Sequence, residues 1–103
     1  MANGSRAVTW SRDALDCLNE IVGTIARDSP RAAARVLDVF DSTAASLSEL
    51  AERGRIVPEL QDSWIREVFV YRYRVMYQVT SDEVRILAVV PGEMDYLSRL
   101  RKT

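Results

Sequence analysis

The spacing of apolar residues changes along the chain, from a helical repeat in the first half to strand-like runs in the second. After Ser11, apolar residues recur every three or four positions, as on one face of an amphipathic helix. This stripe consists of Ala14, Leu15, Leu18, Ile21, Val22 and Ile25. Ser11 suits the N-cap position, and Asp28-Ser29-Pro30 interrupts the repeat. We therefore predict a helix from Ser11 to Asp28.

A second helical stripe follows at once and predicts a helix from Pro30 to Arg53. It consists of Ala33, Val36, Leu37, Phe40, Ala44, Leu47, Leu50 and Ala51. Ser29 can cap this helix, and Pro30 suits its first turn. Gly54 stands where a residue just past a helix end is expected. Two helices joined so tightly should form an αα-hairpin.

The stretch from Arg66 to Val90 is rich in Val, Ile, Tyr and Phe, which favour strands. The predicted strands are residues 6–10, 65–71, 73–80 and 84–90, with a loop at 55–63 and a turn at 81–83. Pro91-Gly92 ends the sheet. In the tail, residues 93–103, helical spacing of Met94, Leu97 and Leu100 indicates a short helix or an extended arm, and residues 1–5 should be frayed.

The expected order of elements is therefore β-α-α-β-β-β, within one domain spanning residues 1–103. An amphipathic helical hairpin buries its stripe most simply on one face of an antiparallel sheet, which gives an α+β fold. The opposite face of the sheet should then stay open. Open faces and edges of small sheets are natural docking places for a partner.

Composition removes several classes of function. The 103 residues contain no histidine and one cysteine, and carry a net charge of -1. Without histidine, Ser-His and Cys-His nucleophiles and most zinc sites are excluded, and we expect no metal or cofactor. Cys17 falls among apolar residues and should be a buried thiol. With no apolar run of about 20 residues and no export signal, we expect a cytoplasmic protein.

Three arginines in the strand-rich stretch are candidates for target binding. Arg72 and Arg74 should project to the same side of a regular strand, and Arg66 could lie near Arg74 across the hairpin. Clustered guanidinium groups would bind phosphate or carboxylate well. The alternative is that these cations are solvated and paired with acids such as Glu67, Asp82 or Glu83.

Aromatic residues in the same stretch allow two interpretations. Phe69, Tyr71, Tyr73 and Tyr77 could stack on bases from an open sheet face. Alternatively, half of them face the helices and form core, which the lack of an RNA-binding signature favours. Trp64 should anchor the preceding loop on the core rather than lie exposed to a partner.

Several short segments, in this order, carry a resemblance to a known family. They are Gly54-Arg55, Val57-Pro58-Glu59-Leu60, Ile65-Arg66-Glu67-Val68 and Tyr73-Arg74-Val75-Met76-Tyr77. Together the chain from Val8 to Tyr96 resembles the RelE/ParE superfamily of bacterial type II toxins. The resemblance implies a helical hairpin on a sheet, and a cognate antitoxin whose flexible segment folds on binding. In this superfamily DNA binding usually belongs to the antitoxin.

The superfamily contains two mechanisms, and the resemblance allows both. RelE-like members cleave mRNA in the ribosome, which here would use Arg74 and Arg66 as catalytic cations and Tyr96 for proton transfer. ParE-like members inhibit DNA gyrase. Where RelE-like members have a second basic residue on the strand that carries Arg66, this chain has Val68. The segment after the last strand is basic in many of those members, whereas here it is the acidic Glu93-Met94-Asp95. A net charge of -1 also suits ribosomal RNA poorly, so we favour a ParE-like toxin that acts by binding, or a member with weak or lost ribonuclease activity. The alternatives are the mRNA endonuclease and a non-toxic interaction module of the same fold.

Overall fold

The computed structural model describes residues 5–60 and 62–93, which form two helices and a five-stranded sheet. In chain order the elements are β1 (Ala7–Trp10), α1 (Arg12–Asp28), α2 (Pro30–Ser46), β2 (Arg55–Ile56), β3 (Ile65–Val70), β4 (Tyr73–Val79) and β5 (Glu83–Pro91). The predicted α+β class and helical hairpin are confirmed. The helix or arm expected after Glu93 lies outside the described residues.

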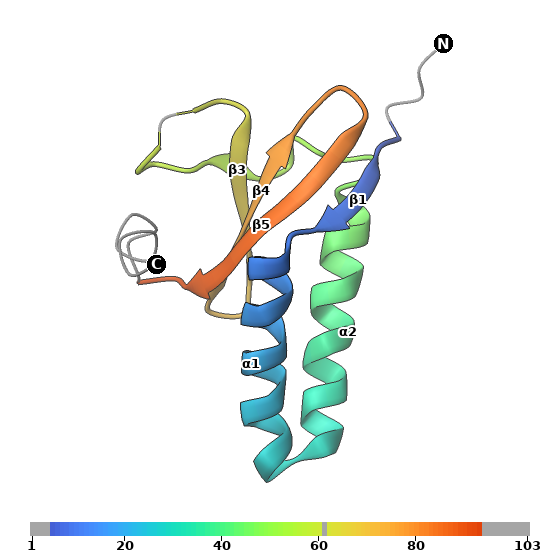
Figure 1. Ribbon diagram of the computed structural model, residues 1–103, viewed down its shortest axis with the longest axis vertical. Coiled ribbons are helices and arrows are strands. Elements are labelled where there is room, and N and C mark those ends of the chain that lie inside the picture. Colours follow the sequence, from blue (N-terminus) through green and yellow to red (C-terminus); the bar gives the residue numbers. More distant parts are fainter. Residues whose placement is uncertain (1–4, 61, 94–103) are drawn as a thin grey trace.

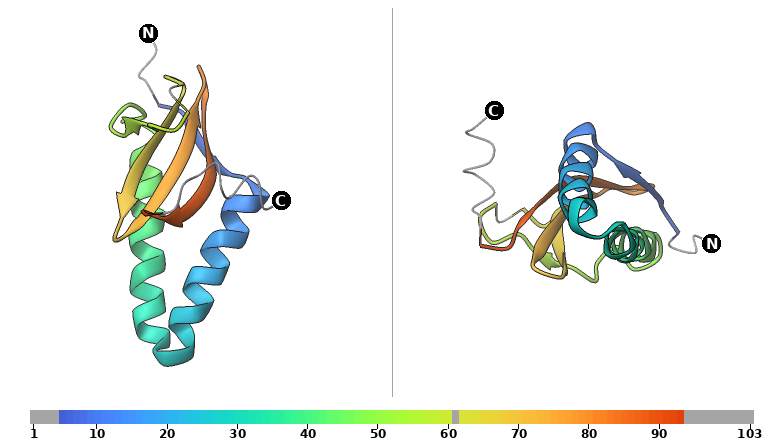
Figure 2. Two further views of the ribbon diagram at one scale, coloured as in Figure 1. Left: turned by 90° about the vertical axis from the view of Figure 1, so that its left-hand side faces the viewer. Right: turned by 90° about the horizontal axis from the view of Figure 1, so that it is seen from below.

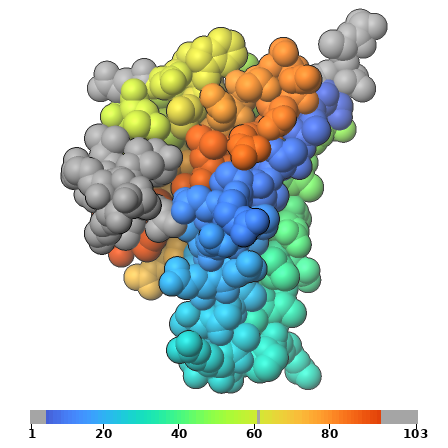
Figure 3. Space-filling view, viewed as in Figure 1, coloured from blue at the N-terminus to red at the C-terminus, as the bar shows by residue number. Residues whose placement is uncertain are grey.

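The helical hairpin begins and turns at the two predicted serine caps. Ser11 Oγ accepts a hydrogen bond from the Ala14 amide at 3.0 Å, and Ser29 Oγ accepts one from the Ala32 amide at 3.1 Å. These contacts satisfy amides that a helix N-terminus leaves unpaired. The two helices lie side by side below the sheet (Figures 1 and 2). In the space-filling view the hairpin extends as a narrow lobe beyond the wider, sheet-bearing part (Figure 3).

The sheet is mixed, which corrects the expectation of a purely antiparallel sheet. The strand order is β1-β5-β4-β3-β2, and β1 pairs in parallel with β5. The remaining pairs are antiparallel. The hairpin returns the chain to the start of β1, where the Arg6 amide donates to the Ser48 carbonyl at 2.8 Å. This return leaves β1 at one edge of the sheet, beside the last strand.

The second helix is shorter than predicted, and a short strand replaces part of the predicted loop. α2 ends at Ser46, because the following residues bend to reach other elements. Ser48 Oγ donates to the Arg6 carbonyl at 2.7 Å, and the Ala51 carbonyl accepts from Tyr77 at 2.8 Å. Gly54 therefore does not follow a helix end, and β2 pairs with β3 directly after it.

The main core lies between the helices and one face of the sheet. Its buried members include Leu18, Phe40, Leu47, Tyr77 and Ile86, and Cys17 is buried as expected. Within the described part of the chain, no helix combines the length and hydrophobicity needed to cross a bilayer.

The other face of the sheet is partly covered, so the expectation of an open face is wrong. A second cluster of buried residues consists of Val57, Met76, Ala88 and Val90, and Leu60 and Ile65 pack against it. Val57 and Leu60 come from the loop after β2. This loop folds back because its apolar side chains find a partner surface on β4 and β5.

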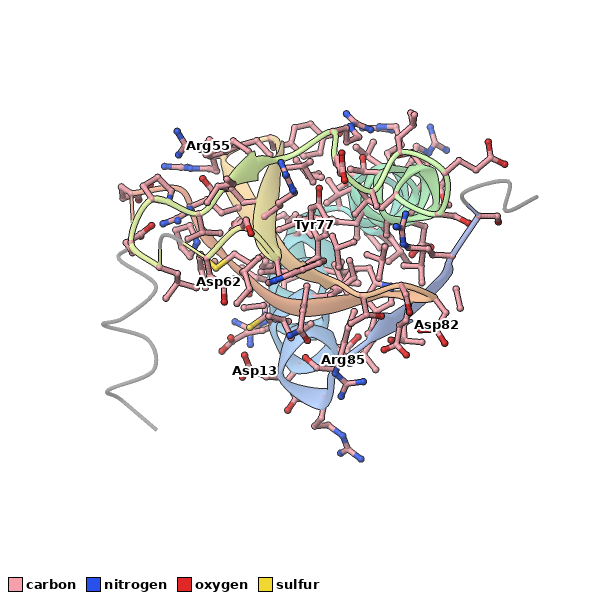
Figure 4. All side chains as sticks on the ribbon, turned by 90° about the horizontal axis from the view of Figure 1, so that it is seen from above. Asp13, Arg55, Asp62, Tyr77, Asp82 and Arg85 are labelled. Carbon is pink, nitrogen blue, oxygen red and sulfur yellow. The ribbon has the colours of Figure 1, made fainter. Side chains whose placement is uncertain are left out.

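Tyr77 holds the segment between α2 and β2 against the core. Its hydroxyl donates to the Ala51 carbonyl and accepts from the Gly54 amide at 3.0 Å. Burial raises the pKa of this phenol above its ordinary value, which keeps the hydroxyl protonated as a donor. Figure 4 places Tyr77 in the middle of the molecule. A Cβ added at Gly54 would lie 2.5 Å from the Tyr77 hydroxyl and 2.5 Å from the Glu67 carbonyl oxygen.

We expect opposite effects from alanine at two glycines. Gly54→Ala forces the backbone at position 54 away from the Glu67 carbonyl of β3 and the Tyr77 hydroxyl, and should lower the free energy of unfolding by about 1–3 kcal/mol. Gly23→Ala in α1 meets no atom within 4 Å. It should stabilise the protein by about 0.5–1 kcal/mol, because alanine favours a helix. Urea unfolding followed by circular dichroism measures both, and equal effects would contradict the close approach at Gly54.

Candidate functional site

Four charged side chains form a chain of ion pairs on the sheet face away from the helices, in the order Glu59, Arg74, Glu67, Arg55. Arg74 Nη1 and Nη2 donate to the two carboxylate oxygens of Glu59 at 2.8 and 2.7 Å. Arg74 Nε donates to Glu67 Oε1 at 2.7 Å. The other oxygen of Glu67 accepts from Arg55 Nε. We call this set the ion network.

Three elements bring the ion network together. Arg55 and Glu67 are directly opposite each other in the β2–β3 pair, and Arg74 on β4 is opposite Phe69. Glu67 and Phe69 are two positions apart on β3, so all these side chains share a face. Glu59 arrives from the loop after β2, which the packing of Val57 holds over the sheet.

Burial falls from the middle of the ion network to its ends. The side chains of Glu67 and Arg74 are 0% and 4% exposed, whereas those of Glu59 and Arg55 are 21% and 60% exposed. Hydrogen bonding to Glu59, helped by Glu67 and opposed by desolvation, raises the pKa of Arg74 above its ordinary value. Arg74 is therefore a permanent cation whose charge is already matched by carboxylates.

A groove lies on the other side of the molecule, between the helical hairpin and the ends of β4 and β5. Two adjoining cavities of about 330 and 320 Å³ share Ile25 and Tyr73 in their walls. The first is also lined by Ile21, Val89 and Pro91, and the second by Val36, Tyr71 and Arg72. We call the two cavities together the hairpin groove. Its apolar lining is the part of the α1 stripe that the sheet does not cover.

The turn between β3 and β4, which ends at the hairpin groove, has an unusual backbone. Tyr71 has a φ of 55°, and it is the one non-glycine residue with positive φ among those described. Side chains in this region of backbone space are strained, so the structure holds an exposed tyrosine where glycine would be easier. Tyr71 is 61% exposed at the tip of the β3–β4 turn.

The comparisons with known proteins agree with this fold. The family model of the ParE toxin of the type II toxin-antitoxin system, parDE, matches residues 8–96. The chain belongs to the ParE toxin family.

A solved structure supports the same assignment at the level of the fold. A chain of the chromosomal ParDE toxin-antitoxin system from P. aeruginosa superposes with a TM-score of 0.71 at 18% sequence identity. The match covers 87% of the present chain and 99% of that chain. No curated protein sequence matches the chain. As a ParE-family member, the chain is the toxin component of a type II system, and an antitoxin partner belongs to such a system.

In this ParE-family toxin the arginines expected to cluster are separated. Arg66 is opposite Tyr77 in the β3–β4 pair, so it lies on the helix face, where its Nη1 donates to the Gly54 carbonyl at 2.9 Å. Arg74 lies on the other face in the ion network. The expectation that Arg66 lies near Arg74 is wrong. Arg74 is opposite Phe69, which is three positions from Arg66 on β3, so the side chains of Arg66 and Arg74 project to opposite faces of the sheet.

Two further residues, Arg72 and Tyr96, are predicted to belong to the site. Arg72 is exposed in the β3–β4 turn rather than in the strand with Arg74, so the two do not share a regular strand face. Tyr96 lies outside the described residues. Roles for Arg66, Arg72, Arg74 and Tyr96 in target binding or catalysis stay predictions.

The aromatic residues divide as the core interpretation predicts, with one correction. Tyr77 is buried and Tyr73 packs against the core, whereas Phe69 and Tyr71 are exposed. Trp64 is 61% exposed, so the expectation that it anchors the loop on the core is wrong. The loop is held instead by the smaller apolar residues Val57 and Leu60.

Sequence reasoning missed the importance of Arg55 and Glu59. The sequence predicts a loop for both residues, and although they stand in segments that resemble the family, their local pattern assigns neither of them a partner or a role. The alternative of pairing with Glu67 was raised for the strand arginines, and the structure shows it for Arg74. The bond between Arg74 and Glu59 spans 15 positions, and no periodicity reveals it.

Breaking the buried pair should destabilise the toxin strongly. Arg74→Met or Glu67→Leu alone leaves a buried charge without its partner, which costs about 3–5 kcal/mol. The double variant should lose less than the sum of the two, since neither buried charge remains. Urea unfolding measures each value. Arg85→Met, at an exposed arginine of β5, is the control and should change stability by less than about 0.5 kcal/mol. A loss for Arg74→Met no larger than this control would contradict a structural role for the pair.

Proposed function

We propose that this toxin arrests growth by binding a protein target, DNA gyrase, in the cytoplasm, and that a cognate antitoxin neutralises it. Membership of the ParE family carries the proposal, since ParE-like members of the superfamily inhibit gyrase. The state of Arg74 adds to it. This cation is nine-tenths or more buried and matched by Glu59 and Glu67, so it is poorly placed to neutralise a scissile phosphate.

The alternative, a ribosome-dependent mRNA endonuclease, loses support from the geometry. RNA cleavage through the 2′-OH needs cations beside the developing phosphorane charge. The two arginines predicted for this task lie on opposite faces of the sheet. The chain contains no histidine, and its net charge of -1 disfavours docking among ribosomal RNA phosphates.

Two assays on the purified toxin separate these functions. We expect it to inhibit supercoiling of relaxed plasmid by gyrase, and to leave ribosome-bound mRNA intact in a primer-extension assay. No effect on gyrase at high molar excess would contradict the proposed target. Cuts at A-site codons would support the endonuclease instead.

The antitoxin is proposed to fold a flexible segment over the hairpin groove and the neighbouring sheet edge. A disordered segment gains affinity by covering a large surface, and apolar side chains are its usual anchors. The groove offers Ile21, Ile25 and Val36 half-buried beside Tyr73, which is the uncovered end of the hairpin's apolar face. The partner is expected to be the product of the adjacent short open reading frame.

An acidic residue in the groove should weaken antitoxin binding. Ile25 lines both cavities, so Ile25→Asp places a charge where the apolar segment docks. The dissociation constant should rise about tenfold or more, as for loss of an interface anchor. Leu15→Asp makes the same kind of change in the same helix, at a residue that lies outside the groove lining. Isothermal titration measures both, and an equal effect of the two substitutions would contradict the assignment of the groove.

A further inference from the structure

The ion network is closed at its centre and open at one end. Glu67 and Arg74 are buried, and Arg55 has the most exposed side chain of the four, at 60%. Figure 4 shows Arg55 at the outer edge of the molecule, away from Tyr77. The Arg55–Glu67 bond uses Nε, and the Arg55 side chain is 60% exposed, so the terminal Nη1 and Nη2 groups are the part of the side chain that remains to bind a partner. No residue in the described ranges accepts a hydrogen bond from them.

Burial of the Glu67–Arg74 pair does not by itself explain why the network is there. A buried ion pair is often no more stabilising than apolar residues of the same volume, because both charges lose their hydration. What the pair does provide is fixed geometry. Glu59 orients Arg74, Arg74 orients Glu67, and Glu67 orients the guanidinium of Arg55. An exposed arginine, which would otherwise move freely, is thus held in one position.

Arg55 is also held from a second side, by Phe69. Its Cζ atom lies 5.7 Å from the centroid of the Phe69 ring, within the range of a cation–π contact. Phe69 is 50% exposed even so. The ring lies close to Gly92, where an added Cβ would be 3.1 Å from Phe69 Cε2 and 2.9 Å from the Arg72 carbonyl oxygen. A glycine at position 92 therefore leaves the space in which the ring sits.

Arg55 and Phe69 together, which we call the Arg55–Phe69 pair, form a small surface that is rigid before any partner arrives. Arginine and aromatic residues dominate the energetics of protein interfaces, and pre-ordered side chains lose little entropy on binding. The fork of Nη1 and Nη2 fits a carboxylate in a bidentate manner. The half-exposed ring offers apolar contact beside it.

The chemistry of the surface favours a protein over a nucleic acid. Binding to a phosphate backbone depends on several cations acting together. Here one guanidinium of the ion network is open to solvent, the two arginines and two glutamates of the network balance one another, and the whole chain has a net charge of -1. One oriented cation next to one aromatic ring matches a protein surface that presents a carboxylate beside an apolar side chain.

We propose that the Arg55–Phe69 pair is the contact through which this toxin grips its protein target, with a target carboxylate bound to the Arg55 fork. The inference rests on the proposed function in one respect, that the toxin acts by binding a protein. It assigns the target contact to the sheet face away from the helices, whereas the antitoxin segment is assigned to the hairpin groove. Different substitutions should therefore separate inhibition from neutralisation.

Two variants test the Arg55–Phe69 pair without removing the buried pair. Arg55→Lys keeps a cation beside Glu67 but loses the planar fork and the stacking, and Phe69→Ala removes an exposed ring. Each should raise the toxin concentration for half-inhibition of gyrase supercoiling about tenfold or more. Arg85→Lys and Leu50→Ala are matched controls at an exposed arginine and an exposed leucine elsewhere, and should leave inhibition unchanged. Thermal unfolding confirms that the variants compared are folded.

The same variants are then titrated with the antitoxin and induced in cells without it. Weaker gyrase inhibition with unchanged antitoxin affinity supports the proposal, and inhibition equal to wild type overturns it while leaving the proposed function intact. A matching loss of antitoxin affinity also overturns it, because the pair would then belong to the antitoxin interface. If the wild-type toxin does not inhibit gyrase, gyrase is not the target, and the growth assay then tests the Arg55–Phe69 pair. Relief of growth inhibition by both variants would support the surface against another protein target, and undiminished inhibition would overturn it.

Discussion

The sheet face away from the helices depends on one buried interaction, the ion pair between Glu67 and Arg74. Glu67 sits in the middle of β3 with no exposed side-chain area, where a lone carboxylate would be very costly. Its two oxygens are taken by Arg74 and Arg55, and Arg74 is completed by Glu59. The pair and its two partners therefore tie together β3, β4, the two-residue edge strand β2 and the loop after β2. Every buried side-chain nitrogen and oxygen atom in the described residues has a hydrogen-bond partner.

Tyr77 has the corresponding role on the helix face. Its hydroxyl binds Ala51 and Gly54, which both lie in the segment that carries the chain from α2 to β2. Arg66 donates to the Gly54 carbonyl from the same side. Gly54 is thus held by contacts from β3 and β4, and β2 can begin directly after it only because no side chain separates it from Glu67. The polar contacts on both faces meet at this short strand, and they place Arg55 at the edge of the sheet.

The elements that the sequence predicts well are those determined by residues close together along the chain. Ser11 and Ser29 cap helices through amides three positions away, and the turn between Val70 and Tyr73 follows from two residues. The end of α2 was predicted too late because its cause is distant. The apolar stripe continues through Leu47 and Ala51, yet these residues are buried in a bent segment that reaches β1 and Tyr77. Likewise, the parallel pairing of β1 with β5 joins residues 76 positions apart, which no local pattern contains.

In the candidate site, too, contacts between residues distant along the chain escape the local sequence pattern, and here they bear on function. A strand arginine looks equally cationic in the sequence whether it is open to solvent or neutralised by carboxylates. The resemblance gives Arg74 the part of a catalytic cation if the chain cleaves RNA, and in the structure its guanidinium is paired with Glu59 and Glu67. The charge of Arg74 is thus used inside the fold. Arg55, which contributes to the family resemblance but is assigned no role from the sequence, is the exposed cation of the network, and Glu67 orients it. The ion network therefore leaves one arginine at the surface, Arg55, beside the exposed ring of Phe69. An arginine next to an aromatic ring is the kind of contact on which protein interfaces depend most.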